Sequence, residues 1–193
     1  MDAEELKSLQ APLKERYREV PEAARITLQA SGQLDSENIA CKVATARAVV
    51  DAGLHPSTGG DGHAVCSGDM LLEALVACAG VTLRAVATAL EIPLRGGTVR
   101  AEGDLDFRGT LGVDRDAAVG FSGVRLHFDL DTDAPPQQIE KLVELTERYC
   151  VVYQTLRNSP QLELQTHRLA AGRDQSPADA KRCAADPAAP HGP

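Results

Sequence analysis

Two of the five cysteines in this chain, Cys78 and Cys150, stand in apolar stretches and are the residues best suited to do chemistry. Cys78 lies in LVACAGVTL and Cys150 in ERYCVVYQTL, with 71 residues between them. A cysteine thiol can attack an electrophile, bind a metal or simply fill a core, and buried free cysteines are most often inert. The residue types alone therefore leave a reactive pair and two structural thiols as alternatives.

A second group of candidate ligands lies in Asp51 to Ser67, DAGLHPSTGGDGHAVCS, which we predict to be a loop of 17 residues. His55, His63 and Cys66 could join Cys41 around a metal, but H-x7-H-x2-C is not a recognised zinc spacing. The STGGDG string lacks the Lys-Ser/Thr of a phosphate-binding loop. The sequence therefore predicts no metal and no cofactor, and we expect this loop to act as a specificity element or lid.

Charge and composition exclude some classes of partner. The chain has 20 Lys and Arg against 28 Asp and Glu, a formal net charge of -8, three Phe, three Tyr and no Trp. A nucleic-acid surface needs clustered cations and stacking rings, so we expect no nucleic-acid partner. The 193 residues predict one compact domain with small appendages.

No basic start followed by an apolar run is present, so we expect no signal peptide, a cytoplasmic protein and mostly reduced thiols. The most apolar segment, Met70 to Leu90, is interrupted by Glu73 and Arg84, which leaves an uncharged run of ten residues. A membrane span needs about 20 such residues. We therefore predict a buried core helix and no membrane association.

Hydrophobic patterning predicts an α+β fold of the order β-β-α-β-β-α-β, because strands that come in adjacent pairs favour hairpins. The strands are expected at Arg25–Leu34, Ile39–Val50, Val99–Arg108, Gly123–Asp131 and Leu162–Thr166, and the helices at Gly68–Glu91 and from Pro135 through Leu145. We expect an N-terminal extension over residues 1–23, helical from Glu4 to Tyr17, and a folded domain over residues 24–170. Residues 171–193 lack large apolar side chains and are predicted to form a disordered tail that carries Cys183.

The helix that carries Cys78 is predicted to lie at the centre of the fold, because it is apolar on nearly every face. Its segment, SGDMLLEALVACAGVTLRAVATALEIPL, resembles the cysteine helix of the OsmC/Ohr family, the osmotically inducible protein C-like and organic hydroperoxide resistance proteins. RYCVVYQTL resembles the second cysteine motif of that family, and the resemblance covers about residues 24–167. It implies an OsmC-like fold and an intertwined homodimer whose paired thiols reduce organic hydroperoxides.

The resemblance also implies roles for the two cysteines. Cys78 would be the peroxidatic thiol that becomes a sulfenic acid, and Cys150 the resolving thiol that forms a disulfide with it. An external dithiol, lipoyl-type or similar, would reopen the disulfide. Burial in mid-helix opposes the thiolate that this chemistry requires, so we expect a cation near Cys78.

In hydroperoxide-reducing members an Arg from an early strand pairs with the thiolate, and a Glu at the start of the cysteine helix holds that Arg. Arg47 is the best match for the Arg, and Arg25 is a poorer one. At the position of the Glu this chain has Gly68, with Asp69 beside it as a weak substitute that is better explained as a first-turn helix charge. A second departure is Val151, where many members have Pro.

Two other functions compete with the peroxidase. Gly68 in place of the Glu motivates a non-catalytic OsmC-like dimer that binds a small hydrophobic ligand or a protein partner. The third alternative is a structural thiol protein with a redox-labile tail at Cys183.

Overall fold

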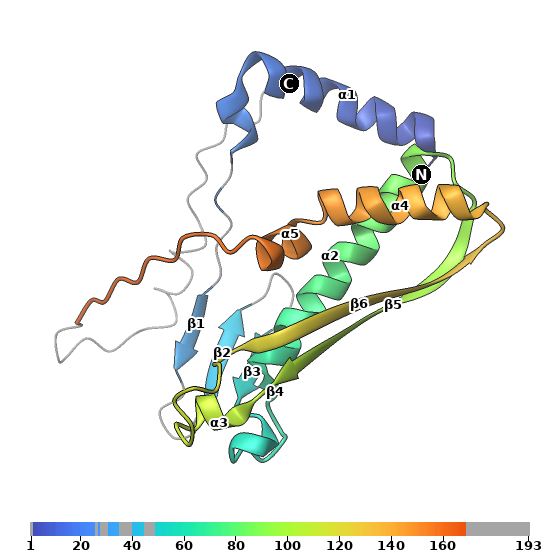
Figure 1. Cartoon of the computed structure of the whole chain (residues 1–193). Coiled ribbons are helices and arrows are strands. Elements are labelled where there is room, and N and C mark those ends of the chain that lie inside the picture. Colours follow the sequence, from blue (N-terminus) through green and yellow to red (C-terminus); the bar gives the residue numbers. More distant parts are fainter. Residues whose placement is uncertain (1, 26, 28–30, 35–39, 45–48, 169–193) are drawn as a thin grey trace. The chain divides into compact units, whose positions relative to one another are not determined.

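The computed structural model describes residues 2–25, 27, 31–34, 40–44 and 49–168 (Figure 1). The chain divides into a unit that ends at Ser159 and a unit that begins at Pro160. The first unit contains every helix and strand of the described residues and is a mixed α+β structure, which confirms the expected fold class. The predicted tail, with Cys183, lies outside the described residues.

A four-stranded sheet precedes the cysteine helix. Its strands are β1 (Ser31–Leu34), β2 (Ala40–Ala44), β3 (Val49–Gly53) and β4 (Val65–Cys66), in that order across the sheet. The first three are antiparallel neighbours, and β4 pairs with β3 in parallel. The single strand expected over Ile39–Val50 is wrong, because β2 and β3 pair with each other and place Ala44 opposite Val49. The intervening TARA has no Gly, Pro, Asn or Asp to signal the break.

The loop predicted over residues 51–67 is shorter in the structure than expected. Residues 51–53 complete β3, and Val65 and Cys66 form β4. Between these strands lies a short 3-10 helix, Pro56–Thr58, capped by His55, whose Nδ1 accepts from the Ser57 N–H. The His55 ring stacks on Phe107, so this histidine has a structural role.

Helix α2 (Ser67–Ala89) agrees with the helix expected over Gly68–Glu91. Its buried side chains form one stripe: Leu75, Ala79, Leu83, Val86 and Ala87. Another face remains open in the single chain, where Val81 is 73% exposed. Of the helices described, α2 alone is long and apolar enough to cross a membrane, a test that core helices of soluble proteins also pass.

A long hairpin packs against α2 (Figure 1). Strands β5 (Leu94–Leu105) and β6 (Phe121–Thr132) are antiparallel, and the connection between them contains the short helix α3 (Phe107–Thr110). The register places Val99 opposite Phe128 and Ala101 opposite Leu126, and these four side chains pack on the cluster around Cys78 and Cys150. Both strands are longer than their apolar alternation indicated.

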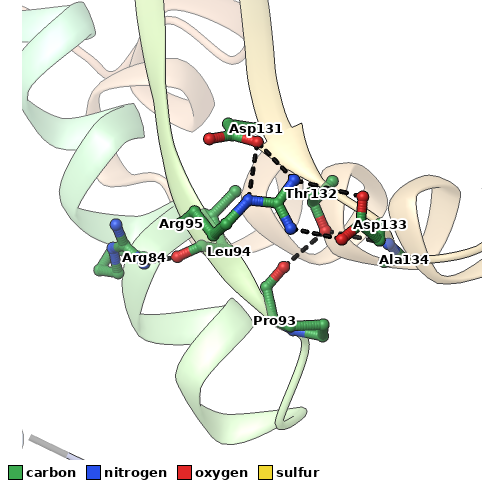
Figure 2. Close-up of polar contacts among 8 residues, drawn as sticks. All are labelled: Arg84, Pro93, Leu94, Arg95, Asp131, Thr132, Asp133 and Ala134. Atoms are coloured by element: carbon green, nitrogen blue, oxygen red, sulfur yellow. Dashed lines mark hydrogen bonds and ion pairs between the residues drawn. The ribbon is translucent and has the colours of Figure 1, made fainter.

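Polar contacts fasten the open end of this hairpin to the connections on either side, as Figure 2 shows. The Arg95 guanidinium bridges the carboxylates of Asp131 and Asp133. The Thr132 hydroxyl donates to the Pro93 carbonyl at 2.6 Å. The turn from α2 into β5 is thereby joined to the turn from β6 into the next helix.

Helix α4 (Pro136–Tyr149) begins with the expected prolines, and a further short helix, α5 (Val151–Arg157), follows directly. Leu142 of α4 is fully buried against Leu83, Val86 and Ile92. Helix α1 (Ala3–Glu19) lies in the N-terminal extension and starts with a capping box between Asp2 and Glu5.

The closing strand expected over Leu162–Thr166 is not formed in the single chain, where this stretch has no regular structure. Leu162 and Leu164 are 91% and 90% exposed. A strand requires a neighbouring strand for its backbone hydrogen bonds, and no strand pairs with this segment among the described residues.

Candidate thiol site

The two cysteines predicted to act together lie against each other. Cys78 is in the middle of α2, and Cys150 is the residue between α4 and α5. Each thiol shifts the pKa of the other. Cys150 is 1% exposed and belongs to a buried cluster with Leu75 and Ala79, on which the partly buried Cys78 packs.

The backbone conformation at Cys150 determines which backbone groups lie near Cys78. Cys150 has φ -72° and ψ 109°, an extended conformation that ends α4 and starts α5 in a new direction. The first amides of a helix have no partner within the helix, so a corner of this kind leaves free N–H donors. Here the N–H groups of Val151 and Val152 act on the Cys78 thiol and lower its pKa.

These donors favour the thiolate of Cys78. Burial raises the pKa of the thiol, as expected in mid-helix. Four hydrogen bonds oppose burial and together hold the pKa below its ordinary value; they come, in order of effect, from the Val152 N–H, the Cys150 thiol, the Val151 N–H and the Thr82 hydroxyl. Among the described residues, backbone and hydroxyl groups thus offset the effect of burial on the Cys78 pKa.

Cys150 is shifted in the opposite direction. Burial raises its pKa most, and the adjacent Cys78 raises it further, against the N–H groups of Tyr153 and Val152. Of the two thiols, Cys78 therefore loses its proton more readily. This asymmetry makes Cys78 the better nucleophile of the two.

The other predicted site residues are Arg47, Arg25 and Asp69. Arg47 lies outside the described residues. Arg25 and Asp69 are exposed, and Asp69, in the first turn of α2, makes no ion pair with any residue that the structure describes. A carboxylate at that position favours the helix N-terminus electrostatically.

Among the described residues, Cys66 forms no metal site with the histidines. Cys66 is half-buried and precedes α2 as its N-cap residue. Within the described ranges no group of three or more His, Cys, Asp or Glu is placed to hold a metal ion. The Cys41 side chain and Cys183 lie outside the described residues.

An apolar pocket of about 620 Å³ lies beside the thiol site. Helix α2 contributes Leu75 and Leu71 to this pocket. They lie on the same face of the helix as Cys78, one turn and two turns before it. Strand β6 and helix α5 supply most of the remaining wall, including Phe121, Val124, Leu126, Tyr153, Leu156 and Arg157. A smaller pocket of about 180 Å³ is lined by Cys150 itself, together with Ala79, Phe128, Thr146 and Glu147 among others.

Sequence reasoning missed the donors that act on Cys78. Thr82 was within reach of pattern analysis, because it lies four residues after Cys78 on the same helical face. The Val151 and Val152 amides could not be found in this way, because no residue type in the sequence signals the change of backbone direction at Cys150. Val151 was the one available signal: proline has no N–H, so a proline at this position would remove one of the donors.

The comparisons with known proteins agree with this fold. The family described as OsmC-like protein matches residues 60–165, which is more than half of the chain. The chain therefore belongs to the OsmC-like family. No curated protein matches the chain.

Solved structures show the same fold at low sequence identity. An OsmC-like protein from Mycoplasma pneumoniae has a TM-score of 0.58 at 15% identity, over 69% of this chain and 89% of that one. An organic hydroperoxide resistance protein from Elizabethkingia anophelis gives 0.57 at 15% identity, over 70% and 91%. A third, from Legionella pneumophila and described as an organic hydroperoxide resistance protein OsmC, gives 0.55 at 19% identity, over 69% and 93%.

Proposed function

We propose that this protein is a thiol-dependent peroxidase that reduces organic hydroperoxides. The observation that carries the proposal is the paired thiols, with the pKa of Cys78 lowered and that of Cys150 raised. Membership of the OsmC-like family and fold neighbours described as organic hydroperoxide resistance proteins support the same class of substrate.

In the proposed cycle, the Cys78 thiolate attacks the distal peroxide oxygen. The O–O bond breaks, Cys78 becomes a sulfenic acid, and the alkoxide takes a proton and leaves as an alcohol. The Cys150 sulfur then attacks the Cys78 sulfur, water leaves, and a disulfide joins the two residues. A dithiol reductant, lipoyl-type or similar, returns both thiols by exchange and becomes a disulfide itself.

The pocket of about 620 Å³ supports an organic substrate over hydrogen peroxide. Its wall of leucine, valine and aromatic side chains offers an alkyl or aryl group a surface that water solvates poorly. Hydrogen peroxide has no group to place there.

We further propose that the protein works as a homodimer in the cytoplasm. The single chain exposes apolar surface that a second copy can cover, namely Val81 on α2 and the alternating Leu162 and Leu164. Small residues next to Val81 suit this part of α2 to close helix packing, since Ala77 is exposed beside it and Gly80 is small.

A non-catalytic dimer that holds a small hydrophobic ligand in the same pocket is the second candidate. Gly68 favours it, because the described part of α2 has no carboxylate at the position where peroxidase members of the family hold their arginine. Native mass spectrometry of gently purified protein that detects a retained ligand, in a protein without turnover, would support this candidate.

Steady-state turnover tests the peroxidase proposal. We expect wild type, supplied with a dithiol, to reduce cumene hydroperoxide with a kcat/KM at least about tenfold above that for hydrogen peroxide. Cys78→Ser should abolish both activities, and Cys66→Ser, a matched change at a half-buried cysteine, should leave them unchanged. Equal rates for wild type and Cys78→Ser would contradict the proposal.

A further inference from the structure

Helix α5, which presents its amides to Cys78, has little to hold it in place by itself. It has seven residues, no buried side chain and no side-chain hydrogen bond at its N-cap. Helices of this length are marginal in isolation because few hydrogen bonds offset the cost of starting the helix. Contacts with the rest of the protein must therefore fix the direction of its first turn.

Three residues of α5 converge on one residue of α4, Glu147, which lies one turn before the corner at Cys150. The Arg157 guanidinium forms an ion pair with the Glu147 carboxylate. The Gln154 side chain donates to the Glu147 carbonyl at 2.8 Å. Burial and then the nearby Glu147 carboxylate raise the pKa of the Tyr153 hydroxyl.

We propose that Glu147 and Arg157 clamp α5 across the corner at Cys150 and so hold the Val151 and Val152 amides against the Cys78 sulfur. Both are positioning residues: neither is among the groups that contact Cys78. The consequence for peroxide reduction rests on the proposed function, whereas the effect on the Cys78 thiol does not.

The surroundings of Cys78 leave few other charged groups to control its ionisation. From β5 and β6 the side chains packed on the thiol cluster are apolar: Val99, Ala101, Leu126 and Phe128. On α2 the nearest charged residues, Glu73 and Arg84, are exposed. The ionisable groups that α4 and α5 place around the thiols are Cys150, Tyr153, Glu147 and Arg157.

A positioning role and a simple charge effect predict opposite shifts in the pKa of Cys78 when Glu147 is substituted. If only charge mattered, Glu147→Gln would lower the pKa of Cys78, because a nearby negative charge disfavours a thiolate, and Arg157→Gln would raise it. If the clamp holds the amides in place, both substitutions release α5 and both raise the pKa. The direction of the Glu147→Gln shift therefore separates the two explanations.

The test is the pH dependence of Cys78 alkylation by iodoacetamide in the full-length protein, with the label assigned to Cys78 by peptide mass spectrometry. We expect the midpoint to rise by roughly 0.5 to 1 pH unit in Glu147→Gln and in Arg157→Gln. Arg157→Lys, which keeps the charge, should return the midpoint part of the way to wild type. Glu144→Gln breaks the exposed Lys141–Glu144 pair on the same helix and should leave the midpoint unchanged.

A lowered or unchanged midpoint in a folded Glu147→Gln variant would overturn the clamp. Circular dichroism and thermal unfolding of each variant establish that it is folded. If Glu147→Gln does not fold, the comparison of Arg157→Gln with wild type tests the proposal. Equal alkylation midpoints in these two proteins would overturn it. Because alkylation requires no peroxide, absence of turnover would count against the proposed function and leave this test intact.

Discussion

At the scale of single residues, polar groups around Cys78 oppose the effect of burial on its thiol. The N–H groups of Val151 and Val152 and the Thr82 hydroxyl lower the pKa of Cys78. Fixed dipoles that already point at a charge stabilise it without reorganisation. Val151 in place of proline is then part of the site, since it adds one donor.

The contribution of the Val151 N–H to the Cys78 pKa can be tested by substitution. Val151→Pro should raise the midpoint pH of Cys78 alkylation, because it removes one N–H from the thiolate. The fold should tolerate the change, since proline suits the first position of a helix and the extended Cys150 suits the residue before a proline. Val151→Ala keeps the N–H and is the control; the same rise in both variants would contradict the assignment of the amide.

At the scale of elements, the site depends on how three helices meet the hairpin. Helix α2 supplies Cys78, the corner between α4 and α5 supplies Cys150 and the amides, and β5 and β6 close the apolar side. Close approach within the hairpin depends on a glycine, because a Cβ on Gly103 would overlap the Phe121 ring.

These contacts predict opposite effects for two glycine substitutions. Gly68→Ala should stabilise the protein by about 0.5 kcal/mol, because alanine favours the helix and its Cβ would lie 3.5 Å from Phe121, an ordinary contact. Gly103→Ala should lower the free energy of unfolding by about 1 to 3 kcal/mol, because the Phe121 ring must move. Urea unfolding monitored by circular dichroism measures both, and a destabilised Gly68→Ala would contradict the packing described.

Patterning could predict the elements with strong periodicity and not the corner that makes the site. Met70 to Leu90 and the alternation through Val99 and Phe128 identify α2 and the hairpin, because burial imposes their periods. The break between Ala44 and Val49 and the corner at Cys150 depend on backbone geometry that no turn-forming residue signals. The cysteine pair could be predicted from the resemblance to the family. The donors around it could be identified only from the structure.

At the scale of the whole molecule, the single chain leaves apolar surface that its own elements do not cover. Val81 on α2 is 73% exposed, and Leu162 and Leu164 alternate along a stretch that pairs with no strand among the described residues. Apolar surface of this kind is typical of protein interfaces. A second copy of the chain is the partner that we propose for it.

A charge placed on this face should therefore dissociate the dimer. Val81→Glu should convert the dimer to a monomer, because burying a carboxylate without a partner is unfavourable. Val119→Glu is a matched control, since Val119 is 74% exposed and lies in the connection between β5 and β6. Sedimentation velocity distinguishes the two results, and a Val81→Glu protein that remains dimeric would exclude this face as the interface.

The central claim is that Cys78 and Cys150 form a redox pair, and intact mass spectrometry tests it most directly. One equivalent of cumene hydroperoxide should remove the mass of two hydrogen atoms from reduced wild type, with a disulfide mapped to Cys78 and Cys150. Cys150→Ser should gain the mass of one oxygen at Cys78, and Cys78→Ser should be unchanged. Wild type that keeps its mass, with both thiols free after exposure to the peroxide, would contradict the account.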